Sequence, residues 1–273
     1  MNLLKTTTLA AGLLALASAA QAEVRTDFKV GWSIYVGWMP WGYAAEAGIV
    51  QKWAEKYGIT IEVTQFNDYV ESINQYTAGA YDAVTLTNMD GLSIPAAGGV
   101  DTTAVIVGDF SAGNDAVILK DGASLADISG RDVNLVEFSV SHYLLARALE
   151  TAGMSERDVK VVNTADPDMV GAFQTADVTA MVTWNPMVSE IAALPGATKV
   201  FDSAQIPGEI IDLMVANTET LADNPDFGKA LAGIWYETVA LATADTPEGV
   251  AARAAMGAAS GTDQAGFEAQ LAA

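Results

Sequence analysis

The 273-residue chain contains no cysteine and a single histidine, His142. The absence of cysteine excludes disulfides, thiolate metal sites, iron–sulfur clusters, cysteine nucleophiles and a lipoprotein anchor. With one histidine, a transition-metal site would consist almost entirely of carboxylates, and the sequence has no calcium-loop pattern. We therefore expect neither a metal nor another cofactor.

Basic residues are also scarce. The chain has 13 Lys and Arg against 34 Asp and Glu, a formal net charge of −21. This balance argues against binding to nucleic acid or anionic lipid. Hydrophobic residues make up 51% of the chain, which is enough to form cores and excludes a disordered chain. Neutral or cationic partners are favoured.

The first residues have the pattern of a secretory signal peptide. Lys5 precedes an apolar run at 9–16 and a small-residue stretch that ends at Ala22. This pattern predicts a signal peptide over residues 1–22. No later segment is a long uninterrupted apolar run, so we expect residues 23–273 to be a soluble periplasmic protein.

Strands alternate with helices along the rest of the chain, which predicts parallel sheets covered by helices on both faces. A turn-rich break at 111–115 separates two such series, and a return strand is expected at 211–216. We therefore expect two lobes. The first is discontinuous, over 23–111 and 210–273, and the second covers 112–209. Predicted strands lie at 27–33, 59–66, 82–87, 102–110, 116–120, 132–137, 159–163 and 178–183, and predicted helices at 41–57, 68–79, 89–97, 143–152, 167–175 and throughout from 221 onward.

A ligand cleft is expected between the lobes, at the carboxyl ends of the strands. Five aromatic residues lie in the segment 32–43 after the first strand. Lobe packing and ligand contact explain Trp32 and Tyr43 equally well, whereas Tyr35, Trp38 and Trp41 favour ligand contact. Aromatic faces suit planar or cationic ligands.

Polar residues follow four of the predicted strands. For Asp68 a helix cap is the simpler explanation, while Asp90 and Glu137 suit a cap and a ligand contact equally well. Ser139 precedes a helix, where it could cap the helix or hold an anion. No Lys or Arg occupies these strand ends, so carboxylates among aromatic rings favour a ligand with several N–H donors.

Catalytic motifs are missing. There is no nucleophile elbow around a serine, no phosphate-binding glycine loop and no carboxylate pair marked by its spacing. The sequence favours a binding protein over an enzyme.

Several segments together resemble the periplasmic solute-binding proteins of ABC importers in the nitrate, sulfonate and taurine group. They are Met39–Gly48, Thr87–Asp90, Ser139–Leu149 and Trp184–Pro186. Two further segments, 36–41 and 67–76, are similar to the urea-carboxylase-associated subgroup, whose solute is urea or guanidine.

The resemblance implies a type II periplasmic-binding fold, an α/β fold with two Rossmann-like lobes joined by a two-stranded hinge. It also implies capture of a small-molecule ligand by lobe closure and docking on an inner-membrane permease with a cytoplasmic ATPase. We expect a monomer. The implied ligand contacts are Trp38, Asn67, Asp68 and Asp90 in the first lobe and Glu137, Ser139 and Trp184 in the second.

Two alternatives stay open. The same class of protein could bind taurine, an aliphatic sulfonate or nitrate at the Ser139 helix end. A relative of pyrimidine synthases would be an enzyme, and its lineage needs an active-site histidine and a cofactor lysine. Members of the group also continue beyond Ala273, which predicts that this chain is a shortened form or a fragment.

Overall fold

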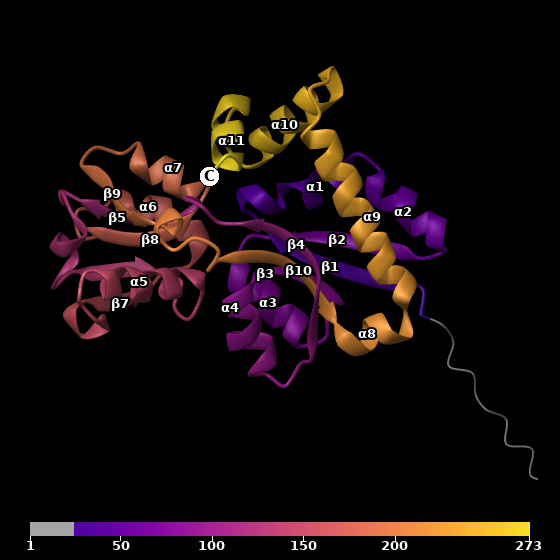
Figure 1. Cartoon of the computed structure of the whole chain (residues 1–273), viewed down its shortest axis with the longest axis horizontal. Helices are drawn as coiled ribbons and strands as arrows, with labels where there is room; N and C mark the ends of the chain where they lie inside the picture. Colours follow the sequence, from indigo (N-terminus) through magenta and orange to yellow (C-terminus); the bar gives the residue numbers. More distant parts are fainter. Residues whose placement is uncertain (1–24) are drawn as a thin grey trace, which may run out of the picture.

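The computed structural model describes residues 25–273, so the predicted signal peptide lies outside the described residues. Two five-stranded sheets, each with its own helices, organise this part of the chain (Figure 1). We call the sheet β2-β1-β3-β10-β4 with its helices the first lobe, and the sheet β7-β6-β8-β5-β9 with its helices the second lobe. The division of the chain at residues 112 and 209 stays a prediction.

The first lobe contains both the beginning and the end of the described chain. Its strands are β1 (Asp27–Ser33), β2 (Thr60–Phe66), β3 (Ala83–Thr87), β4 (Thr102–Phe110) and β10 (Ile211–Asn217). Its helices are α1 (Met39–Glu46), α2 (Ile49–Tyr57), α3 (Tyr69–Thr77), α4 (Asn88–Gly91), α8 (Thr218–Asp223), α9 (Pro225–Ala242), α10 (Pro247–Ala259) and α11 (Gln264–Leu271). Strand β3 is buried along its whole length, as expected for a central strand covered on both faces.

The second lobe is built from the middle of the chain. Its strands are β5 (Asp115–Lys120), β6 (Asp132–Leu135), β7 (Lys160–Asn163), β8 (Ala180–Trp184) and β9 (Ala197–Asp202). Its helices are α5 (Val140–Thr151), α6 (Met169–Gln174) and α7 (Met187–Ala192). Helix α5 begins after Ser139, whose side chain accepts a hydrogen bond from the Ser141 amide.

Both sheets are mixed, so the prediction of parallel sheets was wrong. Strand β10 runs antiparallel to β3 and β4, and β5 runs antiparallel to β8 and β9. Each of these strands is the first that the chain forms after it crosses between lobes. They therefore begin at the edge where the parallel strands end, which pairs Asp212 with Thr87 and Asp115 with Trp184.

Some helix predictions also need correction. The single helix expected over 41–57 is two helices, because Gly48 has a left-handed φ of 76° between them. Helix α7 and strand β9 were not predicted. Strand β9 is only partly buried, so its sequence lacks a clear apolar alternation. None of the helices in residues 25–273 has the length and apolar character needed to cross a bilayer.

Candidate ligand cleft between the lobes

A small cavity lies where the carboxyl edges of the two sheets face each other, and we call it the cleft cavity. Its volume is about 10 Å³, which is room for about one water molecule. Both lobes contribute to its lining, which consists of Tyr35, Trp38, Tyr69, Thr87, Asp115, Val140, Trp184 and Asp212. The lobes are therefore closed on each other, with aromatic and carboxylic side chains at the contact.

Four aromatic side chains form one connected group around this cavity, which we call the aromatic box. The Tyr35 and Trp38 rings meet edge to face with centroids 5.1 Å apart, and Trp38 and Tyr69 are 5.4 Å apart. Tyr69 in turn meets Trp184 of the second lobe edge to face at 5.5 Å. Such contacts are favourable aromatic geometries, so the box joins the lobes, and all four of its residues line the cavity.

Asp90 follows β3 and is fully buried. Its Oδ2 accepts hydrogen bonds from Tyr69 Oη at 2.5 Å, from Thr87 Oγ1 at 2.8 Å and from the Val140 amide of the second lobe at 3.3 Å. The Val140 amide belongs to the first residue of α5. A carboxylate of the first lobe thus lies at the N-terminus of a helix of the second lobe, where the helix dipole favours negative charge.

Three further carboxyl groups surround Tyr35, and we call Asp109, Asp115 and Asp212 the acidic cluster. Asp109 is the last residue but one of β4, and its Oδ1 accepts a hydrogen bond from Tyr35 Oη at 3.1 Å. Asp115 accepts a hydrogen bond from Ser111 Oγ at 2.5 Å. Among the ion pairs of residues 25–273, none involves these three carboxyls or Asp90.

Burial without a cationic partner raises the pKa of these carboxyls. Desolvation raises the pKa of Asp90 to about 6. Desolvation, together with the charges of Asp109 and Asp90, raises the pKa of Asp115 to about 7. Desolvation also raises the pKa of Asp212 well above its usual range, and the neighbouring carboxyls of Asp109 and Asp115 add to this shift. The cleft therefore holds protons on some of its carboxyls near neutral pH.

Three buried polar atoms at the cleft have no hydrogen-bond partner among residues 25–273: Asp90 Oδ1, Asp212 Oδ2 and Trp38 Nε1. Asp212 and Trp38 line the cleft cavity and are only 2% and 4% exposed. Unpaired buried polar groups are costly, and such groups in a native structure call for an explanation. A ligand with N–H donors would satisfy the two carboxyl oxygens.

Direct hydrogen bonds also join the lobes. The Tyr69 amide donates to Asp166 Oδ1 at 3.2 Å, and Trp184 Nε1 donates to the Ile34 carbonyl at 3.2 Å. The Val36 amide donates to the Asn185 carbonyl at 3.3 Å. These bonds, with the one from Val140 to Asp90, hold the lobes in the closed arrangement.

The structure brings together three of the predicted site residues: Trp38, Asp90 and Trp184 lie at the cleft. Asn67 is exposed and lines a separate, more open cavity of about 360 Å³, together with Asp166. The Asp68 side chain accepts a hydrogen bond from the Glu71 amide at 2.8 Å and so caps α3.

Glu137 and Ser139 also lie apart from the cavity lining. The Glu137 amide donates to Asn163 Oδ1, and its side chain is half-buried. Ser139 caps the first turn of α5, and its Oγ also donates a hydrogen bond to the Val136 carbonyl at 2.8 Å. Their proposed contact with a ligand stays a prediction.

Tyr69, Asp115 and Asp212 line the cleft cavity but are not among the site residues predicted from the sequence. Asp115 and Asp212 stand at or next to the start of β5 and β10, whereas the prediction rests on the carboxyl ends of strands. The sequence does contain a signal for Asp212: it is a lone aspartate within the apolar strand 211–216, and an unpaired buried charge is costly unless it has a function. His142 has a packing role, since its Nδ1 accepts the Phe138 amide and its Nε2 lies 3.2 Å from Glu156 Oε1.

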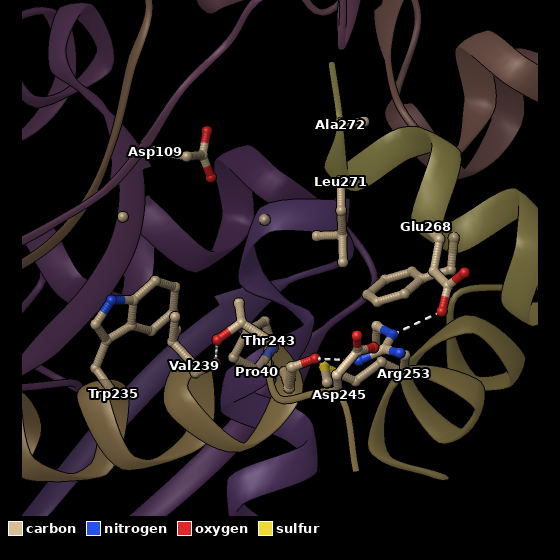
Figure 2. Close-up of a pocket in the computed structure, with 15 residues that line it drawn as sticks. Pro40, Asp109, Trp235, Val239, Thr243, Asp245, Arg253, Glu268, Leu271 and Ala272 are labelled. Atoms are coloured by element: carbon tan, nitrogen blue, oxygen red, sulfur yellow. Dashed lines mark hydrogen bonds and ion pairs between the residues drawn. The ribbon is translucent and has the colours of Figure 1, made fainter. Parts of the chain in front are cut away.

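A second, larger cavity lies behind the cleft, between α1, β4 and the C-terminal helices, and we call it the rear cavity (Figure 2). Its volume is about 510 Å³, and its lining is mostly apolar. Asp109 reaches both this cavity and Tyr35 of the cleft. No three carboxylate or histidine side chains within residues 25–273 converge as a metal site.

Comparison with known proteins identifies the family. A model of the NMT1-like family matches residues 29–256. The chain belongs to the NMT1-like family. A binding protein of Brucella abortus is 28% identical over 216 residues, which cover 77% of this chain and 66% of that protein. The taurine-binding periplasmic protein of Escherichia coli is 23% identical over 184 residues, covering 66% of this chain and 56% of that protein.

Solved structures establish the fold of this NMT1-like protein. The alkanesulfonate-binding protein of Xanthomonas axonopodis bound to MOPS has a TM-score of 0.75 at 17% identity, covering 92% of this chain and 85% of that chain. The nitrate-binding protein of Synechocystis has a TM-score of 0.68 at 14% identity, covering 85% of this chain and 64% of that chain. The expected periplasmic-binding fold is thus confirmed.

Proposed function

We propose that this NMT1-like protein is the solute-binding component of an ABC importer, and that it captures a small nitrogen-rich solute, guanidinium or urea, in the cleft. It would act as a periplasmic monomer without catalysis, after removal of its signal peptide, and deliver the solute to an inner-membrane permease driven by a cytoplasmic ATPase. Its family and its similarity to proteins named for solute binding support the general role.

One observation carries the choice of solute. The cleft combines an aromatic box with buried carboxyls that no Lys, Arg or His pairs with among the described residues. Carboxylates accept paired hydrogen bonds from planar groups such as guanidinium, and aromatic faces attract cations. The unpartnered Asp90 Oδ1 and Asp212 Oδ2 are the acceptors that such a ligand would use.

Taurine, an aliphatic sulfonate or nitrate is the second candidate, because relatives carry names of that kind. An anion would need donors, and the N-terminus of α5 is the natural place for them. Its first amide, that of Val140, already donates to Asp90, and the Ser141 amide donates to Ser139 Oγ. The protein's own carboxylate therefore occupies the position that a sulfonate would take, which supports the cation.

A thermal-shift screen tests this function with guanidinium chloride, urea, taurine, an alkanesulfonate and nitrate, each matched in ionic strength with sodium chloride. A ligand that binds only the folded state raises the melting temperature by mass action. We expect guanidinium or urea to raise it at millimolar concentration. A rise with taurine or nitrate alone would reassign the cleft to anions.

A further inference from the structure

Asp109 differs from the other carboxyls of the acidic cluster in its position. It lies outside the cleft cavity and faces the rear cavity, whereas Asp115 and Asp212 line the cleft cavity. Its neighbour across the sheet is Asp212, since the two residues are register partners in β4 and β10. Asp109 therefore adjoins the cleft carboxyls and also reaches a larger space.

The local sequence keeps Asp109 in this place. Gly37 lies beside it, and a Cβ at position 37 would overlap Asp109 Oδ2 and come within 2.6 Å of Tyr35 Cε1. The hydrogen bond from Tyr35 Oη to Asp109 Oδ1 fixes the carboxyl from the other side. Asp109, Tyr35 and the bare backbone at Gly37 thus form one packed unit.

Within residues 25–273, no Lys, Arg or His forms an ion pair with this cluster. The groups that face Asp212 are Asp109 from β4, Asp115 from β5 and the Tyr35 hydroxyl, and Asp90 adds its charge toward Asp115. Arg253, which also lines the rear cavity, pairs with Glu268 at 2.6 Å and donates to the Ala242 carbonyl at 2.7 Å. Figure 2 shows Asp109 well separated from that ion pair across the cavity.

Adjacent buried carboxyls cannot all ionise, so they share protons. Tyr35 Oη donates a hydrogen bond to Asp109 Oδ1, which favours the charged form of Asp109, whereas Asp212 is only 2% exposed and has Asp115 as a further carboxyl neighbour. Of the two carboxyls, Asp212 therefore keeps the proton and Asp109 the charge. A cation that enters the cleft balances the negative charge of the carboxylates in place of this proton, so the proton can leave. The Asp212 O–H bond breaks, the proton passes to the Asp109 carboxylate, and from there to a water molecule or buffer base in the rear cavity.

We propose that the cleft exchanges a proton for its cationic ligand, and that Asp109, a positioning residue outside the cavity, keeps the exchangeable proton on Asp212. This proposal rests on the proposed function, because it assumes that a cation enters the cleft. It adds that capture is coupled to pH: the bound state has one cation more and one proton fewer than the free state.

Calorimetry with guanidinium chloride tests the exchange. Titrations at pH 7 in phosphate and in Tris, whose heats of ionisation differ, give the number of protons released per ligand. We expect about one proton in the unaltered protein, and an affinity that falls about tenfold for each pH unit between pH 7 and pH 5. Binding without proton release would overturn the exchange and leave the proposed function intact.

Two variants test the role of Asp109. Asp109→Asn keeps the shape and the acceptor for Tyr35 but removes the charge, so fewer protons should be released. Asp245→Asn is the matched control, because Asp245 is an exposed carboxylate that lines the same rear cavity. Full proton release by Asp109→Asn, or an equal loss in Asp245→Asn, would contradict the assigned role.

A titration without ligand separates this proposal from the proposed function. Carboxyl 13C signals of the free protein, followed by NMR from pH 4 to pH 9, should show Asp212 losing its proton at a lower pH in Asp109→Asn than in the unaltered protein. If guanidinium fails to bind at any pH, the proposed solute is wrong. An Asp212 midpoint unchanged by Asp109→Asn would overturn the role of Asp109 in either case.

Discussion

Asp90 connects the lobes through a single carboxyl group. It receives two hydroxyl donors from its own lobe and the first amide of α5 from the other lobe, and its second oxygen remains unpartnered. Charge-assisted hydrogen bonds of this kind are about twice as strong as neutral ones. The residue is therefore suited both to closing the lobes and to contacting a cation.

Asp90→Asn should weaken guanidinium binding by more than tenfold, because it removes a buried charge next to the ligand. Calorimetric affinity measures the effect. Asp263→Asn is the control, since asparagine caps a helix as well as aspartate does and Asp263 caps α11. Unchanged binding in Asp90→Asn would rule out the carboxylate mechanism.

Gly37→Ala should destabilise the protein by about 1–3 kcal/mol, the typical cost of overpacking a close contact. The added Cβ would displace Asp109 or Tyr35. Urea unfolding gives the change in the free energy of unfolding. Gly171→Ala in α6 is the matched control, because a Cβ there meets nothing within 4 Å and alanine favours a helix. Equal stability of both variants would disagree with the packing described for Gly37.

At the scale of the element, helix α5 depends on its first turn. Ser139→Ala should lower the free energy of unfolding by about 1 kcal/mol, as expected for loss of an N-cap. Urea unfolding measures this change. Thr246→Ala, which removes the cap of α10, should cost a similar amount. An unchanged free energy of unfolding in Ser139→Ala would contradict the capping role, whereas a loss of affinity measured by calorimetry would support the predicted ligand contact of Ser139.

The sequence predicted most strands and the region of the cleft because local patterns determine both. Trp38 and Asp90 come shortly after strands β1 and β3, and Trp184 is the last residue of β8, so an argument from strand ends finds all three. The same argument does not find Asp115 and Asp212, because they stand at the beginning of strands. Whether such a strand runs antiparallel depends on how the chain crosses between lobes, which is a long-range property that no local pattern contains.

At the scale of the whole molecule, the buried carboxyls make stability depend on pH. Their pKa values rise from 3.8 to about 6 for Asp90 and Asp166 and to about 7 for Asp115, so the folded state binds more protons than the unfolded state between about pH 4 and pH 7. The contribution of these carboxyls to the free energy of unfolding is therefore fully present below pH 4 and is lost as the pH rises to 7.

The free protein should therefore unfold at a lower urea concentration at pH 8 than at pH 5, as measured by circular dichroism. A cationic ligand bound to the ionised carboxyls should reduce this difference. If the free protein is more stable at pH 8, the buried carboxyls are ionised already and their raised pKa values are wrong.

The central claim is that the closed cleft selects a cation with N–H donors over an anion. Equilibrium dialysis with radiolabelled guanidinium and radiolabelled taurine, each below about 1 mM, tests it directly, since guanidinium at that concentration has a negligible denaturing effect. The account predicts saturable binding of guanidinium, at one site per chain, and none of taurine. Saturable binding of taurine without binding of guanidinium would contradict it.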